Sequence, residues 1–305
     1  MRLRPVHISF ALLAACAAAL GWVEWRRQSF DASVAGLVRH LPAANATQVY
    51  LDVQALRSAG LLEMLAGSKA AQETEYRDFV DRTKFDYTQD LDGVLASFQG
   101  AKKSFLLRGR FDWDQIRRYA EFKGAKCVNG FCAAETKRPG QFISHFALAP
   151  NVLALSVSDN EWGAQVLRER RDTGGFQPPP HAVWLTMPES ALNGADGLPD
   201  GLRAFLGAIR GADRATISLA PRADAFQAEL AVTCKSVQQG SEIHANLDKM
   251  TDLLRKFLAR AKQEPNPRDL AGVLSGGRFT QDGAVVKGVW PIEKVFLELL
   301  AEGNI

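Results

Sequence analysis

Two cysteines lie symmetrically about an Asn-Gly pair, Cys127 and Cys132 in the stretch CVNGFC. Thiols at this spacing can form a disulfide or contribute to a metal site. Asn-Gly is the preferred pair for a two-residue type I′ turn, because both positions need a positive φ. In such a hairpin the cysteines face each other at a non-hydrogen-bonded position, where side chains approach most closely. A metal would need two further ligands, so we predict a Cys127–Cys132 disulfide and a free Cys234 in its strand.

An acidic group occurs upstream in FDYTQDLDGVL, where Asp86, Asp90 and Asp92 precede a glycine. Clustered carboxylates suggest calcium binding or acid-base chemistry. The spacing departs from the EF-hand pattern and lacks its closing glutamate. We therefore interpret the group as an acidic turn before an apolar stretch, and keep it as a weak candidate site.

Other catalytic patterns are missing from the sequence. Five histidines occur, and none belongs to a His-Glu-x-x-His pair. The chain has no Gly-x-Ser-x-Gly elbow and no phosphate-binding loop of the Walker or dinucleotide type. We expect no catalytic residue, no metal site and no cofactor.

The N-terminus has the pattern of an export signal. Arg2 and Arg4 precede an uncharged run over residues 5–23, and Trp22 and Trp25 lie at its end. A run of about 19 residues is long enough to cross the hydrocarbon core of a bilayer as a helix. We therefore predict a signal anchor over residues 1–27 that spans a bacterial cytoplasmic membrane once.

Two alternatives stay open for this segment. Leu13–Cys16 resembles a bacterial lipobox, in which Cys16 would be lipidated after cleavage. Cleavage after Ala17–Ala19 would instead release a secreted protein. All three interpretations place residues 28–305 outside the cytoplasm, where a disulfide persists.

Composition restricts the class of protein. The 305 residues are 47% hydrophobic and 23% charged, as in a folded globular protein. The net charge is +3, with acidic and basic residues interspersed. Nucleic-acid binding usually needs a concentrated basic face, so we expect no nucleic-acid partner.

The strongest break in the chain is the Gly/Pro-rich stretch at residues 174–180. Val49–Leu51 and Val183–Leu185 are similar apolar stretches, and each precedes a helical pattern. The order of predicted strands and helices then repeats on both sides of the break. We predict an α+β fold in which a transmembrane helix precedes two tandem, internally duplicated modules with mainly antiparallel sheets. The predicted ranges are 1–27 anchor, 28–45 linker, 46–173 first module, 174–180 linker and 181–305 second module.

Three helix starts follow from capping patterns. Asp112 with Gln115 predicts a helix start, as does the capping box of Ser158 with Glu161. Pro291 suits the first turn of a C-terminal helix.

The stretches FDYTQDLDGVLASF, FLLRGRFDWDQIRRYA, CVNGFC and LALSVSDNEW resemble a group of exported, membrane-anchored bacterial proteins of unknown function. The resemblance covers most of the first half of the chain and weakens in the second. It implies a location in the bacterial envelope and provides no catalytic residues.

These observations favour a membrane-tethered extracytoplasmic binding or scaffold module without catalysis. Its expected partners are the membrane, through residues 5–23, and an envelope protein or an apolar ligand. One alternative is an envelope hydrolase whose carboxylates, Asp86, Asp90 or Asp92, converge in the fold. Another is a carrier that holds an apolar ligand between sheet and helices.

Overall fold

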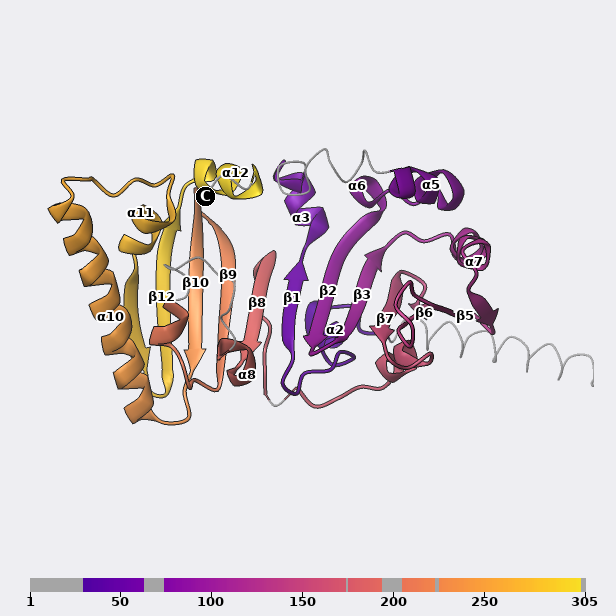
Figure 1. Cartoon of the computed structure of the whole chain (residues 1–305), viewed down its shortest axis with the longest axis horizontal. Coiled ribbons are helices and arrows are strands. Elements are labelled where there is room, and N and C mark those ends of the chain that lie inside the picture. Colours follow the sequence, from indigo (N-terminus) through magenta and orange to yellow (C-terminus); the bar gives the residue numbers. More distant parts are fainter. Residues whose placement is uncertain (1–29, 63–73, 174, 194–204, 223–224, 303–305) are drawn as a thin grey trace, which may run out of the picture.

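A computed structural model describes residues 30–62, 74–173, 175–193, 205–222 and 225–302. Its centre is one antiparallel sheet of twelve strands, with helices at its ends and on its faces (Figure 1). The strand order is β11-β12-β10-β9-β8-β1-β2-β3-β7-β6-β5-β4. The fold is therefore mixed α/β with a large antiparallel sheet.

Along much of their length the strands alternate buried and more exposed side chains, because neighbouring residues point to opposite faces of the sheet. In chain order they are β1 (Thr47–Leu51), β2 (Leu91–Gln99), β3 (Lys102–Gly109), β4 (Lys126–Val128), β5 (Phe131–Glu135), β6 (Phe142–Ala149), β7 (Val152–Ser158), β8 (Val183–Pro188), β9 (Arg214–Arg222), β10 (Ala225–Thr233), β11 (Arg278–Asp282) and β12 (Val285–Ile292).

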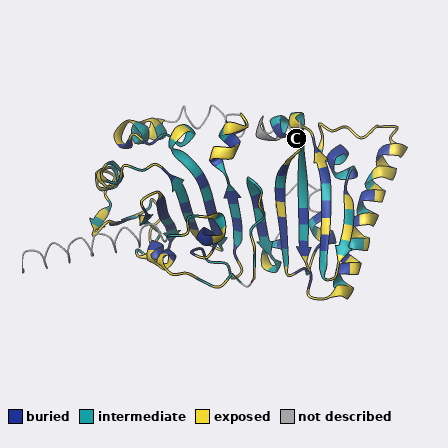
Figure 2. Ribbon diagram, turned by 180° about the vertical axis from the view of Figure 1, so that it is seen from behind, coloured by how far each residue is buried: buried dark blue, intermediate teal, exposed yellow. Residues whose placement is uncertain are grey.

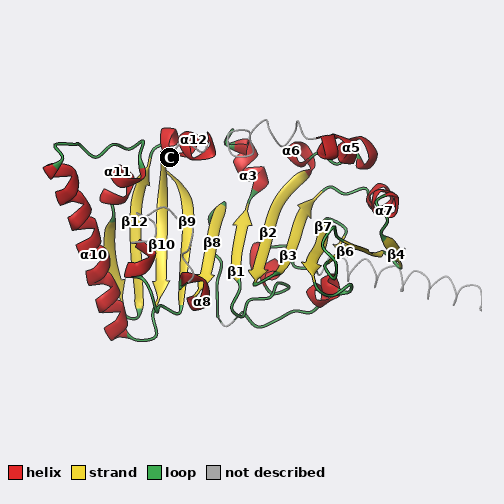
Figure 3. Cartoon of the chain, in the orientation of Figure 1, coloured by secondary structure: helices red, strands yellow, loops and turns green. Residues whose placement is uncertain are grey.

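Several helices begin where a side chain caps the first turn, as Asp112 does by accepting from the amides of Asp114 and Gln115. Figure 3 shows α3, α5, α6 and α12 gathered at the same end of the strands. The helices are α2 (Val34–Val38), α3 (Val53–Ser58), α5 (Thr74–Thr83), α6 (Tyr87–Asp90), α7 (Trp113–Phe122), the 3₁₀ helix η1 (Gly163–Arg168), α8 (Glu189–Leu192), α10 (Val237–Arg260), α11 (Leu270–Ser275) and α12 (Lys294–Glu302).

The prediction of two tandem modules with their own sheets is wrong. β1 pairs with β8 in antiparallel register, with Tyr50 opposite Trp184, so strands from both sides of residues 174–180 form one sheet. The pairing joins strands that are far apart in the chain, which local sequence patterns do not reveal. The domain boundaries stay a prediction.

The predicted membrane helix is not found among the described residues. Within them, no helix is both long and apolar enough to cross a bilayer. The predicted anchor over residues 1–27 lies outside the described residues. The described fold therefore differs from the predicted one in its single sheet.

Two large apolar cores lie along the sheet, and the strands that line them carry dark-blue bands of buried residues in Figure 2. In one core, α2 and η1 pack on the face of the sheet that presents Leu106, Phe146 and Trp184. In the other, α10 and α12 pack on β10 and β12. Trp184 is fully buried at the middle of the sheet, so the β1–β8 junction is part of the core.

Two of the predicted helix starts are wrong. The hydroxyl of Ser158 bonds to Asn160, and η1 begins beyond it at Gly163 without a side-chain cap. Pro291 lies inside β12, opposite Gln227 of β10. A strand that continues to Ile292 therefore occupies the position where the sequence suggested a first helical turn.

Candidate apolar binding site

The disulfide hairpin forms as predicted. Cys127 lies opposite Cys132 in the β4–β5 pair, and the two sulfurs are bonded. Asn129 and Gly130 both have positive φ, at 50° and 77°, as a type I′ turn requires. Cys234 is free and buried just after β10.

An apolar cavity of about 370 Å³ lies between this end of the sheet and helices α5 and α7. Its floor is the sheet face opposite the α2–η1 core, since neighbouring residues of a strand point to opposite faces. The floor consists of alternate residues of four adjacent strands, Leu107 of β3, Leu153 and Leu155 of β7, Ile143 and His145 of β6, and Cys132 and Ala134 of β5.

The roof of the cavity follows from the amphipathic pattern of α7. Ile116, Tyr119, Ala120 and Lys123 recur at helical spacing and line the cavity together. The cap at Asp112 fixes where this helix begins.

Aromatic rings close the side of the cavity that faces α5. Phe79 packs edge-on against Tyr119 at 5.1 Å between ring centroids, and Phe85 stacks on Phe111 at 5.0 Å. All four rings line the cavity. Edge-on and stacked contacts of this kind favour fixed ring positions.

The polar groups of the cavity are few. Burial lowers the pKa of His145, and its Nδ1 is buried without a hydrogen-bond partner in the described structure. At the other end, the ammonium group of Lys123 lies 3.3 Å from the carboxylate of Asp78, which raises the pKa of Lys123. The cavity thus combines apolar walls with one neutral imidazole and one paired cation.

The disulfide contributes to the wall of this cavity. Cys132 lines both the apolar cavity and an adjoining one of about 230 Å³, which reaches Trp113 and Arg117 of α7. His145 also lines both cavities. The sequence predicts the β4–β5 hairpin itself. Its position beside α7 follows from the pairing of β5 with β6.

The acidic residues lie elsewhere. Asp86 caps α6 and accepts hydrogen bonds from Thr88 and Tyr76. Although burial acts in the opposite direction, these bonds hold the pKa of Asp86 below its usual range. Asp90 accepts from the amide of Asp86 and forms an ion pair with Arg110 at 3.0 Å.

Asp92 lies in β2, where the register with β3 shifts between Leu91 and Gly93. In the described part of the chain, no group of three or more histidine, cysteine or acidic side chains is placed to hold a metal ion. Cys16, the candidate lipidation site, lies outside the described residues.

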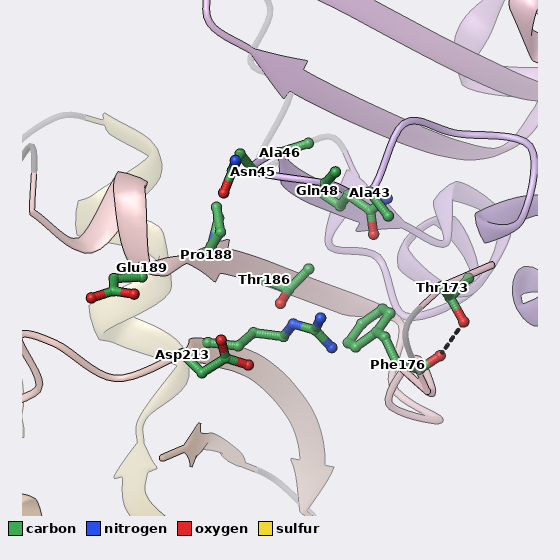
Figure 4. A pocket seen from close by; sticks show the side chains of 12 residues that line it. Ala43, Asn45, Ala46, Gln48, Thr173, Phe176, Thr186, Pro188, Glu189 and Asp213 are labelled. Carbon is green, nitrogen blue, oxygen red and sulfur yellow. Dashed lines mark hydrogen bonds between the residues drawn. The ribbon is translucent and has the colours of Figure 1, made fainter. Parts of the chain in front are cut away.

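A smaller polar cavity of about 190 Å³ lies beside the β1–β8 junction (Figure 4). The guanidinium of Arg214 lies 5.1 Å from the ring centre of Phe176. The carboxylate of Glu189 accepts a hydrogen bond from Lys235 at 2.7 Å. Two of the charged side chains around this cavity are therefore already bound to neighbours.

No protein-family model matches the chain, and no curated protein sequence matches it. Crystal form I of TP0453, a treponemal protein of unknown function, has a similar fold, with a TM-score of 0.51. The two chains are 12% identical, and the match covers 90% of this chain and 99% of TP0453. Crystal form IV gives a TM-score of 0.42 at 13% identity over 84% of this chain and 91% of the other. This likeness concerns the fold alone, and the neighbour is compatible with the resemblance to uncharacterised bacterial proteins.

Proposed function

We propose that the protein is a binding module that holds an apolar small molecule, such as an acyl chain, in the cavity between α7 and the sheet. The observation that supports this most directly is the composition of the cavity. Its volume of about 370 Å³ lies in the range of ligand sites, and aliphatic and aromatic side chains form most of its walls. Cavities of this kind stay dry and accept apolar guests.

The polar groups suggest how such a guest is oriented. The unpartnered Nδ1 of His145 offers one hydrogen-bonding position at the floor, and Lys123 offers a cation beside α5. A molecule with an apolar body and one polar end fits this arrangement better than a polyol or a peptide does. Its affinity would come mainly from buried methylene groups, at about 0.8 kcal/mol each.

The hydrolase alternative has less support. It depends on Asp86, Asp90 or Asp92, and the first two are engaged as a helix cap and in an ion pair. They line neither the apolar cavity nor the one in Figure 4.

The extracytoplasmic location and the attachment to a membrane through residues 5–23 remain part of this proposal. Both rest on the sequence, with the Cys127–Cys132 disulfide in support of an oxidising compartment.

Filling the cavity tests the proposal. The double variant Ala120→Phe/Ala134→Phe adds a ring to the roof and one to the floor, while Ala101→Phe adds a ring at the exposed β2–β3 turn. Titration with the fluorescent probe 1-N-phenylnaphthylamine, and its displacement by palmitate, should show saturable binding to the wild type and to Ala101→Phe. The double variant should bind at least about tenfold more weakly, a loss of about 1.4 kcal/mol. A folded double variant with wild-type affinity would contradict this site.

A further inference from the structure

A row of small polar side chains crosses the sheet on the face opposite the apolar cavity. Each member lies directly opposite the next in the strand register, and each is at most 9% exposed. From β6 to β9 the polar row is Ser144, Ser156, Ser104, Ser97, Gln48, Thr186 and Thr216. Buried hydroxyl and amide groups need hydrogen-bond partners, so each member requires an account of its bonds.

Most members of the polar row bond to covering segments or to one another. Ser97 and Gln48 both donate to the carbonyl of Pro42, at 2.6 and 3.2 Å. Ser144 accepts from the amide of Ala164 at 3.0 Å. The hydroxyl of Thr216 donates to that of Thr186 at 3.0 Å.

Ser104 and Ser156 differ from the rest of the row. They lie opposite each other on β3 and β7, at 5% and 3% exposure, and neither hydroxyl has a hydrogen bond within the described chain. Both line a cavity of about 210 Å³ between the sheet and η1, which we call the row cavity. Neither oxygen is among the fully buried polar atoms that lack a partner, so both hydroxyls reach the cavity and can bond to an occupant that supplies acceptors.

A guanidinium group adds a third uncommitted donor. Arg171 lines the row cavity, and its Nη2 donates to the carbonyl of Val166 at 3.1 Å. Its Nε is buried without a hydrogen-bond partner. Lys102, which pairs with Asp159 at 3.3 Å, provides a second cation at the rim.

The charged side chains that line the row cavity are cationic. Two cationic side chains line it, and no carboxylate does so among the described residues. Gly163 lets η1 approach closely, because a Cβ there would lie 2.9 Å from the Ser156 hydroxyl and 2.3 Å from that of Ser158. Hydroxyl, guanidinium and ammonium donors therefore converge on one small space.

We infer that the row cavity binds a phosphate group, either as inorganic phosphate or as a small phosphomonoester. Phosphate provides three or four strong acceptor oxygens, enough for the two serine hydroxyls and for Arg171 together, and Arg favours this geometry. The inference concerns the face of the sheet opposite the apolar cavity and does not depend on the proposed function.

Isothermal titration calorimetry of the full chain at constant ionic strength tests this inference. Separate titrations use inorganic phosphate, glycerol 3-phosphate and acetate. The wild type should bind at least one of the two phosphate compounds, and acetate at least tenfold more weakly. Tighter binding of glycerol 3-phosphate would assign the site to a phosphomonoester, and equal or tighter binding of inorganic phosphate to the free ion.

Ser104→Ala/Ser156→Ala should weaken phosphate binding at least tenfold. Its unfolding midpoint in urea without phosphate should stay close to that of the wild type, because neither hydroxyl has a protein partner. Ser218→Ala removes a similarly buried serine on β9, far from the row cavity, and should bind like the wild type. Arg171→Gln should also weaken binding. No phosphate binding by the wild type, unchanged affinity in the double serine variant, or equal binding of acetate would each overturn the inference.

Discussion

Single residues in this protein derive their properties from the sheet face on which they lie. His145 and Ser144 are neighbours on β6, yet the imidazole lies on the face of the apolar cavity while the hydroxyl lies on the opposite face, in the polar row. On the apolar face, burial lowers the pKa of His145 because the charged form loses its hydration. On the other face, the Ser144 hydroxyl accepts a backbone hydrogen bond and stabilises the packing of η1. Strand alternation thus separates two chemistries within one dipeptide.

Stability should therefore decrease in mild acid. The pKa of His145 is lowered from 6.5 in the folded state, so the unfolded chain binds more protons below that pH and unfolding becomes easier. His40 contributes in the same direction, since burial also lowers its pKa. Urea unfolding at pH 7.5 and 5.5 should show a lower free energy of unfolding at pH 5.5.

His145→Gln should reduce that difference without abolishing it, because His40 remains. Both pH values lie above the range in which most carboxylates titrate, and the pKa of Asp86 is lowered further, so Asp86 does not contribute to the difference in stability. Equal stability of the wild type at both pH values, or the same decrease in His145→Gln, would contradict the burial of an uncharged imidazole at this site.

At the scale of elements, the structure confirms two predictions that depend on residues close together in the chain. The Asn129-Gly130 turn and the Asp112 cap depend on residues within a few positions of one another, and both form as predicted.

The sequence was less informative where a residue has a competing partner. The predicted helix start at Ser158 is wrong because its hydroxyl bonds to Asn160 instead. Pro291 was misassigned because a strand partner, β10, outweighs its helical preference. The cavity could not be predicted, because the sequence of α7 shows an apolar face but does not show that β3 pairs with the distant strand β7 beneath it.

The β4–β5 hairpin provides a direct test at this scale. Trypsin should release residues 127–137 as one peptide, about 2 Da lighter than its reduced form, that resists alkylation until reductant is added. Closing so short a loop should stabilise the fold by about 2 kcal/mol at most, so Cys127→Ser/Cys132→Ser should remain folded with a slightly lower unfolding midpoint. Cys234→Ser leaves the disulfide intact and serves as the matched control for loss of a thiol. Double alkylation of the peptide in non-reduced protein from the cell envelope would show that the bond does not form there.

At the scale of the whole molecule, the β1–β8 pair decides the architecture. Tyr50 and Trp184 lie opposite each other, with ring centroids 5.8 Å apart, and Trp184 has no exposed surface. The polar row also crosses this junction, from Gln48 to Thr186. The sheet continues from one side of residues 174–180 to the other, and Trp184 of the second half belongs to the apolar core of the first.

Because the sheet is continuous, we expect that neither half of the chain is stable and soluble on its own. If the chain is cut between Thr173 and Gly175 and the halves are separated, β1 and β8 each become an edge strand with one unpaired side. Such edges bind other strands readily. Residues 1–173 and 175–305, expressed together, should therefore co-elute as a 1:1 complex, while each half expressed alone should aggregate. Trp184→Asp should abolish the complex because it buries an unpaired charge at the junction, whereas Ala101→Asp, at an exposed turn, should leave it intact. The opposite result would be two soluble monomers that elute separately in size-exclusion chromatography. In that case the β1–β8 pairing does not hold the sheet together, and the tandem arrangement expected from the sequence describes the molecule better.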